Sequence, residues 1–286
     1  IYIMIKSIAI LLTVYNRKEK TLKCLEMLFQ QDITDKYKVQ VYLTDDGCTD
    51  GTSNAIHEKF PQVYIIKGYQ NLFWNRGMWT AWNTATKIQK YDYYLWLNDD
   101  TNTYPHMLSS LITTSESQRD KAIIVGPTID TKSKKIHTYG GRINKKLVPL
   151  NGKLQKCETF NGNIVLIPHY VHELIGFNDP YFHHSLGDLD YGMRANKAGI
   201  PIYQLGIPVG ECDRHERIMQ WCDPEVSFFK RWKALFQPTG YPPKEVFYFN
   251  QKHYGVIKAI ICTITAFVRC LIPTLWIKIN LSLIHI

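Results

Sequence analysis

Residues 8–30, IAILLTVYNRKEKTLKCLEMLFQ, decide the fold class of this chain. The first seven residues form an apolar run of the length expected for a buried strand, and leucines at helical spacing follow after residue 18. A short polar segment, residues 15–17, lies between them. A buried strand followed at once by an amphipathic helix is typical of a βαβ unit, so we expect the next strand to lie parallel to the first.

The same alternation continues as far as residue 97. It predicts strands over 39–44, 63–66 and 93–97 and helices over 52–60 and 77–90. This order indicates an α/β fold with a mainly parallel sheet and helices on both faces. Farther along, we expect a hairpin-like insertion over 127–160, a strand over 161–167 and a helix over 187–199 that ends at its glycine.

Composition limits the class of protein and its partners. The 286 residues are 45% hydrophobic and 21% charged, which excludes a disordered or fibrous chain. The net charge of +9 favours anionic partners. Seven scattered cysteines without a CxxC pair argue against a disulfide framework or a structural zinc site, so we expect a reducing cytoplasm. The start lacks a small-residue cleavage site, so we expect no signal peptide, and Met4 is a candidate initiator.

Polar residues follow three of the predicted strands. These segments are 13–17, 45–51 and 98–101, and they supply carboxylates, amides and glycines. Ligands of open α/β sheets bind beyond the carboxyl ends of the strands. Turn chemistry would explain one such cluster, since Asp, Asn and Gly are common turn residues. Three clusters at one sheet edge favour a ligand site.

Four motifs together resemble those of the family 2 glycosyltransferases of GT-A fold. They are Thr13-Val-Tyr-Asn-Arg17, Asp45-Asp-Gly-Cys-Thr-Asp-Gly-Thr52, Leu97-Asn-Asp-Asp-Thr101 and Gly187-Asp-Leu-Asp-Tyr-Gly-Met-Arg194, and the resemblance covers residues 6–215. Each motif alone is weak, whereas four in register are specific. The resemblance implies a GT-A domain over 1–225 with a Rossmann-like mixed sheet. The composition of the tail predicts a helical, amphipathic and membrane-associating extension over 226–286.

The resemblance also implies an activity. It is inverting, metal-dependent transfer of a sugar from a UDP- or dTDP-sugar to a hydroxyl of a glycan or polyprenyl-linked acceptor, in bacterial surface-polysaccharide synthesis. The alternative is a degenerate, non-catalytic GT-A module that binds a nucleotide or a partner at the membrane. Asn98 and Gly187, which stand where the family has acids, support that alternative, whereas the retained Asp100 and Asp188 favour the enzyme.

Other classes fit the sequence less well. A nucleotidyltransferase needs a glycine-rich signature after the first strand, and a dinucleotide oxidoreductase needs GxGxxG there; residues 13–17 contain no glycine. We expect no nucleic-acid partner, because the acids at the strand ends would repel phosphate in the absence of a metal.

The family's metal site implies Mn²⁺ or Mg²⁺, which prefer oxygen ligands and bridge the diphosphate as a Lewis acid. Asp100 matches the direct ligand, and Asn98 takes the first place of the DxD motif. A late histidine often completes this site in the family. A gapless count puts Cys212 at its position, so His215 is preferred and Asp213 is second choice. An Asx turn is the structural alternative for residues 98–100.

The resemblance assigns the remaining donor contacts to seven residues: Thr13, Tyr15, Arg17, Asp45, Asp46, Arg76 and Asp99. The two acids at 45 and 46 would accept hydrogen bonds from the base and ribose, and the arginines would contact phosphate. Arg17 has an equally plain alternative role at the start of a helix. Trp74, Trp79 and Trp82 are candidates for stacking a sugar ring, although their helical spacing favours core packing for at least two of them.

Asp188 is the predicted catalytic base. Alignment backward from Arg194 places Asp188 on the family's central acid, Asp190 on the last acid and Gly187 on its glutamate. Both acids also lie where a helix N-terminus favours negative charge, so capping is the structural alternative. We expect Arg194 to be a structural partner of Asp190.

The carboxyl-terminal part is apolar and basic. From residue 254 onward the apolar run is interrupted by Lys258, Arg269, Pro273 and Lys278, so it is too short to span a bilayer. With Trp276, and with the aromatic and basic segment 228–233, it predicts helices that lie in a membrane interface. Packing on the GT-A domain is the alternative. The expected location is cytoplasmic, peripheral at the inner face of the plasma membrane.

Overall fold

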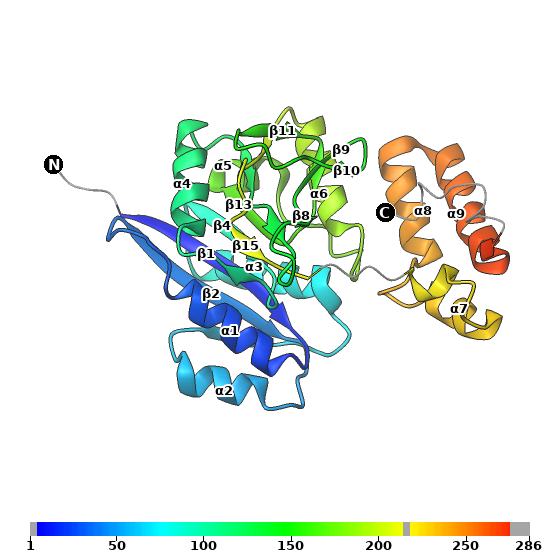
Figure 1. Cartoon of the computed structure of the whole chain (residues 1–286), viewed down its shortest axis with the longest axis horizontal. Coiled ribbons are helices and arrows are strands. Elements are labelled where there is room, and N and C mark those ends of the chain that lie inside the picture. Colours follow the sequence, from blue (N-terminus) through cyan, green and yellow to red (C-terminus); the bar gives the residue numbers. More distant parts are fainter. Residues whose placement is uncertain (1–4, 214–217, 275–286) are drawn as a thin grey trace. The chain divides into compact units, whose positions relative to one another are not determined.

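The computed structural model describes residues 5–213 and 218–274. The chain forms two compact units (Figure 1). The first contains Ile1–Pro180 and Gly187–Arg214, and the second contains Tyr181–Leu186 and His215–Ile286. The six residues Tyr181–Leu186 therefore belong to the second unit although the chain on both sides of them belongs to the first.

An eight-stranded sheet forms the centre of the first unit. Its strand order is β11-β14-β6-β13-β4-β1-β2-β3. The strands are β1 (Lys6–Val14), β2 (Tyr37–Asp45), β3 (Tyr64–Lys67), β4 (Tyr93–Leu97), β6 (Ile123–Val125), β11 (Gln155–Cys157), β13 (Ile164–Pro168) and β14 (Ile202–Gln204). The half β3-β2-β1-β4 is parallel throughout, whereas β13 runs antiparallel to both of its neighbours.

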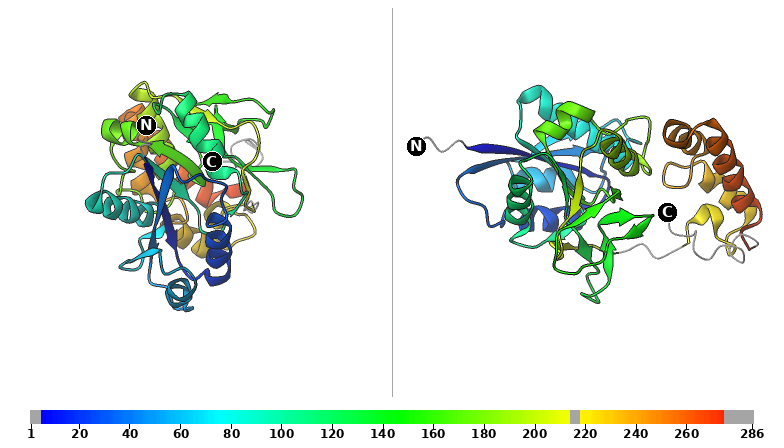
Figure 2. Two further views of the ribbon diagram at one scale, coloured as in Figure 1. Left: turned by 90° about the vertical axis from the view of Figure 1, so that its left-hand side faces the viewer. Right: turned by 90° about the horizontal axis from the view of Figure 1, so that it is seen from above.

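Helices cover both faces of this sheet (Figure 2). Alternate residues of β1 divide the core, since Ile8 and Ile10 pack with one group of helices and Ala9 and Leu11 with the other. The first group is α1 (Lys18–Leu28), α2 (Thr52–Lys59) and α4 (Met107–Ser117), and the second is α3 (Phe73–Ile88), α5 (His169–Ile175) and α6 (Gly187–Lys197). The predicted α/β class, with a mixed sheet flanked by helices, is confirmed.

The strand register brings the polar segments to one edge. Val14 of β1 is opposite Asp45 of β2, and Leu97 of β4 is opposite Ile164 of β13. Because β13 is antiparallel, its beginning lies where β4 ends. The turn that precedes β13 therefore joins the same edge as the three polar strand ends.

The insertion over 127–160 is more elaborate than a single hairpin. Strands β7 (Thr128–Ile129) and β8 (His137–Tyr139) pair antiparallel, and β5 (Asn102–Thr103) and β15 (Gly210–Glu211) complete their sheet. A second small sheet contains β9 (Gly141–Ile143), β10 (Lys146–Leu147) and β12 (Thr159–Phe160). The remaining strand of this region, β11, extends the central sheet.

The second unit is helical. Its elements are a short 3-10 helix η1 (Gln220–Cys222), α7 (Phe228–Leu235), α8 (Pro243–Tyr254) and α9 (Val256–Leu271). The segment 181–186 is anchored within this unit. Phe182 is fully buried, the rings of Tyr181 and Tyr248 lie 4.0 Å apart, and His183 Nδ1 shares a hydrogen bond with Glu245 Oε1 at 2.5 Å.

Two arginines of this unit are internal. Arg231 is buried and donates from Nε to the carbonyl of Cys270 at 2.8 Å, and Arg269 is buried with its guanidinium 4.8 Å from the ring centre of Trp221. Both guanidinium groups are therefore directed into the unit, so the cationic character expected of segment 228–233 and of the tail comes from the lysines. Trp276 and Lys278 lie outside the described residues.

Helix length bears on the membrane question. Among the helices in residues 5–213 and 218–274, none has the length and apolarity needed to cross a bilayer.

Candidate active site

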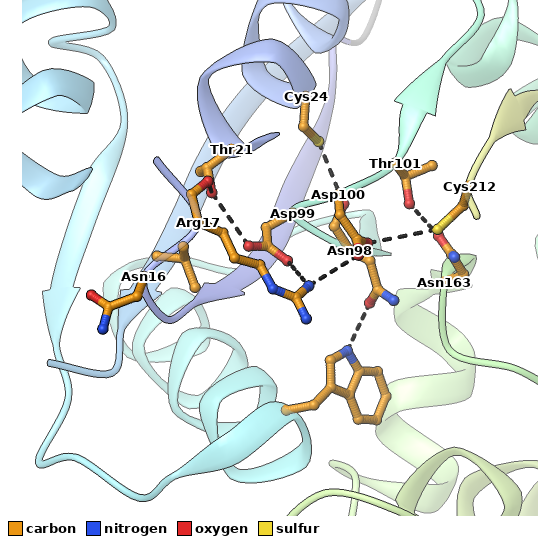
Figure 3. A network of polar contacts seen from close by, with 12 residues as sticks. Asn16, Arg17, Thr21, Cys24, Asn98, Asp99, Asp100, Thr101, Asn163 and Cys212 are labelled. Carbon is orange, nitrogen blue, oxygen red and sulfur yellow. Dashed lines mark hydrogen bonds and ion pairs between the residues drawn. The ribbon is translucent and has the colours of Figure 1, made fainter. Parts of the chain in front are cut away.

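The end of β4 carries two adjacent carboxylates that share one arginine (Figure 3). Arg17 Nη1 lies 3.2 Å from Asp99 Oδ1 and 3.0 Å from Asp100 Oδ2. Thr21, one turn into α1, donates to Asp99 Oδ2 at 3.3 Å. Arg17 comes directly before α1, so the β1–α1 connection supplies the positive charge to the end of β4.

Burial controls the electrostatics of this pair. Burial raises the pKa of Asp99 to about 6, although the charge of Arg17 acts in the opposite direction. The pKa of Arg17 is also raised, because Asp99 and Asp100 outweigh the effect of its burial. One guanidinium faces two carboxylates, so the cluster retains negative charge when both acids are ionised. A negative charge of this kind favours a second cation.

The possible metal ligands at this site are the carboxylate oxygens, because the nearby sulfur of Cys212 is a neutral thiol. Cys212 is buried, and its thiol lies 3.7 Å from Asp100 Oδ1. Burial and then the charge of Asp100 raise the pKa of Cys212 to about 12, so the group remains a neutral thiol near neutral pH. The carboxylates of Asp99 and Asp100 fit Mg²⁺ or Mn²⁺, which take further ligands from phosphate and water.

No group of three or more His, Cys, Asp or Glu side chains within residues 5–213 and 218–274 is arranged to hold a metal ion. His215, predicted as a late ligand, lies outside the described residues. The second choice, Asp213, has its Oδ1 bound to Thr131. Asn98, predicted in the first place of the motif, accepts a hydrogen bond at Oδ1 from Trp74 Nε1 at 2.7 Å.

Asp45 and Asp46 organise the neighbouring loops. Asp45 Oδ1 accepts the N–H groups of Gly47 at 3.0 Å and Cys48 at 2.7 Å, and Oδ2 accepts the hydroxyl of Ser53. Burial alone would raise the pKa of Asp45, but these hydrogen bonds outweigh it and lower the pKa. The contacts use part of the carboxylate's acceptor capacity and leave room for a donor from a ligand.

Asp46 has a role that the sequence analysis missed. It is buried, and its carboxylate accepts the N–H groups of Leu72 at 2.9 Å and Phe73 at 3.0 Å. The first N–H groups of a helix have no partner within the helix, and Asp46 supplies one here from a distance in sequence, so it caps α3. The cap explains why α3 begins at Phe73, four residues before the expected start at Gly77.

The other predicted donor contacts are spread along the same edge. Thr13 is the next-to-last residue of β1, and a Cβ added at Gly77 would lie 2.1 Å from its Oγ1. Tyr15 is exposed. Arg76 is on α3 and donates from Nε to the carbonyl of Pro180 at 2.9 Å.

Asp188 is a partly buried carboxylate held by main-chain donors. Its Oδ2 accepts the N–H of Gly162 at 3.0 Å, and its Oδ1 accepts the N–H of Leu189 at 2.8 Å. Burial raises the pKa of Asp188 above its ordinary value, and the two N–H groups offset part of that rise. It lies in the first turn of α6, where the helix dipole favours negative charge.

Gly187 is required by packing. A Cβ at this position would lie 1.9 Å from Oδ1 of Asn75. Asn75 is fully buried and fixed, because its Nδ2 donates to the carbonyl of Asp179 at 2.8 Å and its Oδ1 accepts from Asn178 Nδ2 at 2.8 Å. The family's glutamate therefore has no room here. One of the two departures that support a degenerate module thus has a steric explanation.

The later acid of the same motif is structural. Asp190 is fully buried and pairs with Arg194, whose Nε lies 2.8 Å from Asp190 Oδ2. The same guanidinium donates to the carbonyls of Ile175 at 2.5 Å and Phe177 at 2.6 Å. The expected partnership of these two residues is confirmed.

Comparisons with known proteins agree with this geometry. Residues 9–172 match the family described as "Glycosyl transferase family 2". The solved structure of S. aureus TarS is similar, with a TM-score of 0.55, 13% identity, and 87% of this chain and 43% of that chain covered. GalNAc-T7 with UDP, GalNAc and Mn²⁺ gives a TM-score of 0.57 and 12% identity, over 87% of this chain and 54% of that one.

These structural likenesses show the fold, and the chain spans about half the length of the structures it matches or less. A search of curated proteins finds no match. The family match, in contrast, extends over more than half of the chain. The chain therefore belongs to glycosyl transferase family 2 and has the GT-A architecture.

Proposed function

We propose that the protein is an inverting, metal-dependent glycosyltransferase that uses a UDP- or dTDP-sugar. Its acceptor is a hydroxyl of a glycan or polyprenyl-linked glycan, and its role is the assembly of a bacterial surface polysaccharide. One observation carries the proposal. Asn163 accepts the N–H of Asn98 at 3.0 Å, and the adjacent Gly162 donates to Asp188 at 3.0 Å. Two consecutive residues thus join the acidic pair of β4 to the predicted base.

The acidic pair is suited to the leaving group. Asp99 and Asp100 would hold a divalent metal, which when bound supplies Lewis-acid stabilisation of the departing diphosphate. Arg17 already lies beside both carboxylates and would add positive charge near the phosphates. Asp45 and the exposed ring of Tyr15 would bind the nucleoside part. The structure of GalNAc-T7 with UDP and Mn²⁺ supports this assignment by analogy of fold.

Asp188 is suited to the acceptor. Its carboxylate accepts the proton of the attacking hydroxyl while the new C–O bond forms at the anomeric carbon. The bond from that carbon to the phosphate oxygen breaks in the same step, so the configuration inverts and the nucleoside diphosphate leaves. General-base assistance contributes about 10²–10⁴ in rate. The N–H groups of Gly162 and Leu189 hold both carboxylate oxygens in place.

Calorimetry tests the donor site first. UDP, dTDP, GDP and CDP are titrated into the full chain with Mn²⁺ and with EDTA. Metal-dependent binding of UDP or dTDP alone is expected, followed by turnover of a sugar carried on that nucleotide. Failure of all four to bind to folded protein would contradict the donor site and favour the degenerate membrane module. Binding that is equal in EDTA would contradict metal dependence alone.

We also propose that the second unit contacts an anionic membrane surface. One face of α9 exposes an aliphatic row at helical spacing: Ile257, Ile260, Ile261, Ile264, Val268 and Leu271. Phe229 on α7 is 82% exposed, and Trp232 of α7 packs on Phe267 of α9, so the two helices are neighbours. Lys230, Lys233 and Lys258 are exposed on these helices, and neither helix contains an acid. This apolar and cationic combination suits a cytoplasmic leaflet rich in anionic lipid.

Vesicle sedimentation tests this surface. The wild-type chain should bind vesicles that contain phosphatidylglycerol more strongly than vesicles of phosphatidylcholine alone. The double variant Ile260→Asn/Ile264→Asn should lose at least about tenfold in partitioning, because each buried isoleucine contributes about 1.5–3 kcal/mol. Ile88→Asn/Ile207→Asn is the matched control, with two half-exposed isoleucines of the first unit. Equal loss in both variants, or none in either, would contradict the assignment.

A further inference from the structure

Trp74 contacts both halves of the candidate site. It lies in the first turn of α3, and its ring is partly buried, edge-on to Trp96 at 5.6 Å. The other two tryptophans of α3 have different surroundings. Trp82 is fully buried among aromatic rings, and Trp79 packs on Phe177. Core packing thus accounts for Trp82, whereas Trp74 has polar and steric contacts that packing alone does not require.

The first contact is with the donor end. Trp74 Nε1 donates to Asn98 Oδ1 at 2.7 Å, and Asn98 directly precedes Asp99 and Asp100. The main-chain N–H of Asn98 donates to the carbonyl of Asn163. Asn98 is thus held by its side chain and by its backbone. An aspartate in this place would also accept the indole N–H, but it would add a third carboxylate to a cluster with one arginine.

The second contact is with the base end. A Cβ at Gly162 would lie 2.4 Å from Cη2 and 2.5 Å from Cζ2 of Trp74, so the indole edge covers the position where residue 162 would have a side chain. The same Cβ would lie 3.3 Å from Cβ of Asp188. Gly162 is therefore enclosed between the ring and the base, and its N–H is aimed at Asp188 Oδ2.

The position of the ring is itself fixed. Phe73, the residue before Trp74, has a φ of 56°, and its N–H donates to the buried carboxylate of Asp46. A left-handed conformation at a bulky residue persists only where its surroundings impose it. Asp46 therefore holds the turn from which the indole projects.

We infer that Trp74 is a positioning residue that sets the gap between the diphosphate-binding carboxylates and the base. The inference rests on the proposed function, because it takes Asp99 and Asp100 as the donor end and Asp188 as the acceptor end. Transfer requires the anomeric carbon and the attacking oxygen to meet at about 3–3.5 Å, and misplacement by about 1 Å costs about 100-fold. Nucleotide binding requires only the donor end. Loss of Trp74 should therefore lower kcat and leave nucleotide affinity unchanged.

The first test compares Trp74→Phe with Trp79→Phe in the full chain. Trp74→Phe keeps a ring and removes the N–H donor. It should lower kcat for transfer, or for hydrolysis of the nucleotide-sugar, about 10- to 100-fold. Donor KM and the Kd for the nucleoside diphosphate should stay within about twofold. Trp79→Phe, on the same helix, should change neither quantity. Equal kcat values in the two variants, or a weaker nucleotide Kd in Trp74→Phe alone, would overturn the inference.

A double-mutant cycle tests the route through Asn98. If the hydrogen bond is the means of positioning, Trp74→Phe/Asn98→Ala should have nearly the same kcat as the more damaged single variant. If the fall in kcat of the double variant equals the product of the two single falls, the residues act separately. That result would contradict positioning through Asn98.

Gly162→Ala is a second variant that leaves the tryptophan in place. Its φ lies outside the left-handed region, so the strain is steric and directed against the indole edge. It should lower kcat without changing nucleotide Kd, and its folding is checked by thermal unfolding. Wild-type kcat in Gly162→Ala would overturn the inference even if Trp74→Phe does not fold. Failure of the wild-type chain to bind nucleotide or turn over any donor would instead overturn the proposed function, and the inference with it.

Discussion

The two acidic ends of the site are stabilised in different ways. At the donor end, Asp99 and Asp100 face the guanidinium of Arg17. At the acceptor end, Asp188 has two neutral N–H donors within hydrogen-bond distance, from Gly162 and Leu189. Asp99 is buried and Asp188 is partly buried, and burial raises the pKa of both groups.

This difference corresponds to two kinds of chemistry. A full positive charge beside a carboxylate keeps it ionised and suits a site that collects cations and phosphate. Neutral donors fix the position of a carboxylate and leave it able to accept a proton. Under the proposed function, the kind of hydrogen-bond donor at each end would separate charge binding from proton transfer, over the short path through residues 162 and 163.

The largest expected effect comes from breaking the acceptor end. Asp188→Asn keeps the shape and one acceptor oxygen but cannot accept the proton. Transfer should fall about 10²- to 10⁴-fold. Nucleotide binding with Mn²⁺, measured by calorimetry, should remain at the wild-type level because the donor end is intact. Unchanged turnover would remove Asp188 from the role of base.

A change at the donor end should weaken nucleotide binding, which the change at the acceptor end leaves intact. Asp100→Ala removes one of two carboxylates and should weaken metal-dependent nucleotide binding by at least about tenfold, since even outer-shell groups of metal sites contribute 10- to 100-fold. The binding that remains in EDTA should not change. A wild-type Kd with Mn²⁺ would show that Asp100 is not a metal ligand.

A second carboxylate beside Asp188 would give the acceptor end two adjacent acids, as at the donor end. Gly187→Glu adds the family's acid, but its Cβ meets Asn75 at 1.9 Å. Overpacking of this kind costs about 1–3 kcal/mol, so thermal or urea unfolding should show a clear loss of stability. Gly199→Glu is the control for an added carboxylate, because a Cβ there meets nothing within 4 Å, although its φ of 72° adds some backbone strain. If Gly187→Glu proves as stable as wild type, the steric explanation is wrong.

The smallest effect is a pH dependence that has opposite signs for activity and stability. The folded-state pKa of Asp188 lies above its ordinary value of 3.8, so activity should rise as pH increases through that raised pKa. The folded state holds the proton more tightly than the unfolded chain. This contribution to stability is therefore full below the unfolded pKa and is lost as pH rises through the folded pKa.

The pH profile is checked by kcat/KM, together with the difference in unfolding free energy between wild type and Asp188→Asn over the same pH interval. That difference should move against wild type as pH rises. A flat difference would mean that burial does not perturb this carboxyl.

Local sequence patterns were sufficient for the fold and for the position of the acidic edge. The period of β1 and the leucines of α1 predict a strand and a helix because each pattern is contained in a few residues. The polar ends of β1, β2 and β4 meet because parallel strands end at one edge. Asp188 was predicted from the resemblance to a family motif, since a single acid has no pattern of its own.

The missed features depend on contacts between distant residues. Asp46 caps α3 from 26 residues away, and Trp74 reaches Asn98 across 24. Nothing in the residues next to Gly187 shows that Asn75 occupies its side-chain space. The burial of Arg231 was missed for the same reason, because its acceptor, the carbonyl of Cys270, is on another helix.

The segment Tyr181–Leu186 makes the second unit discontinuous along the chain, and this has a consequence for protein engineering. A cut at residue 214 would keep the segment but remove Glu245 and Tyr248, the groups that hold His183 and Tyr181. Exchange of carboxyl-terminal parts between relatives would likewise need to transfer these six residues, which end one residue before Gly187. A chimera with a single junction near residue 214 would combine segment 181–186 of one relative with the helices of another, and so divide the second unit between two parent proteins.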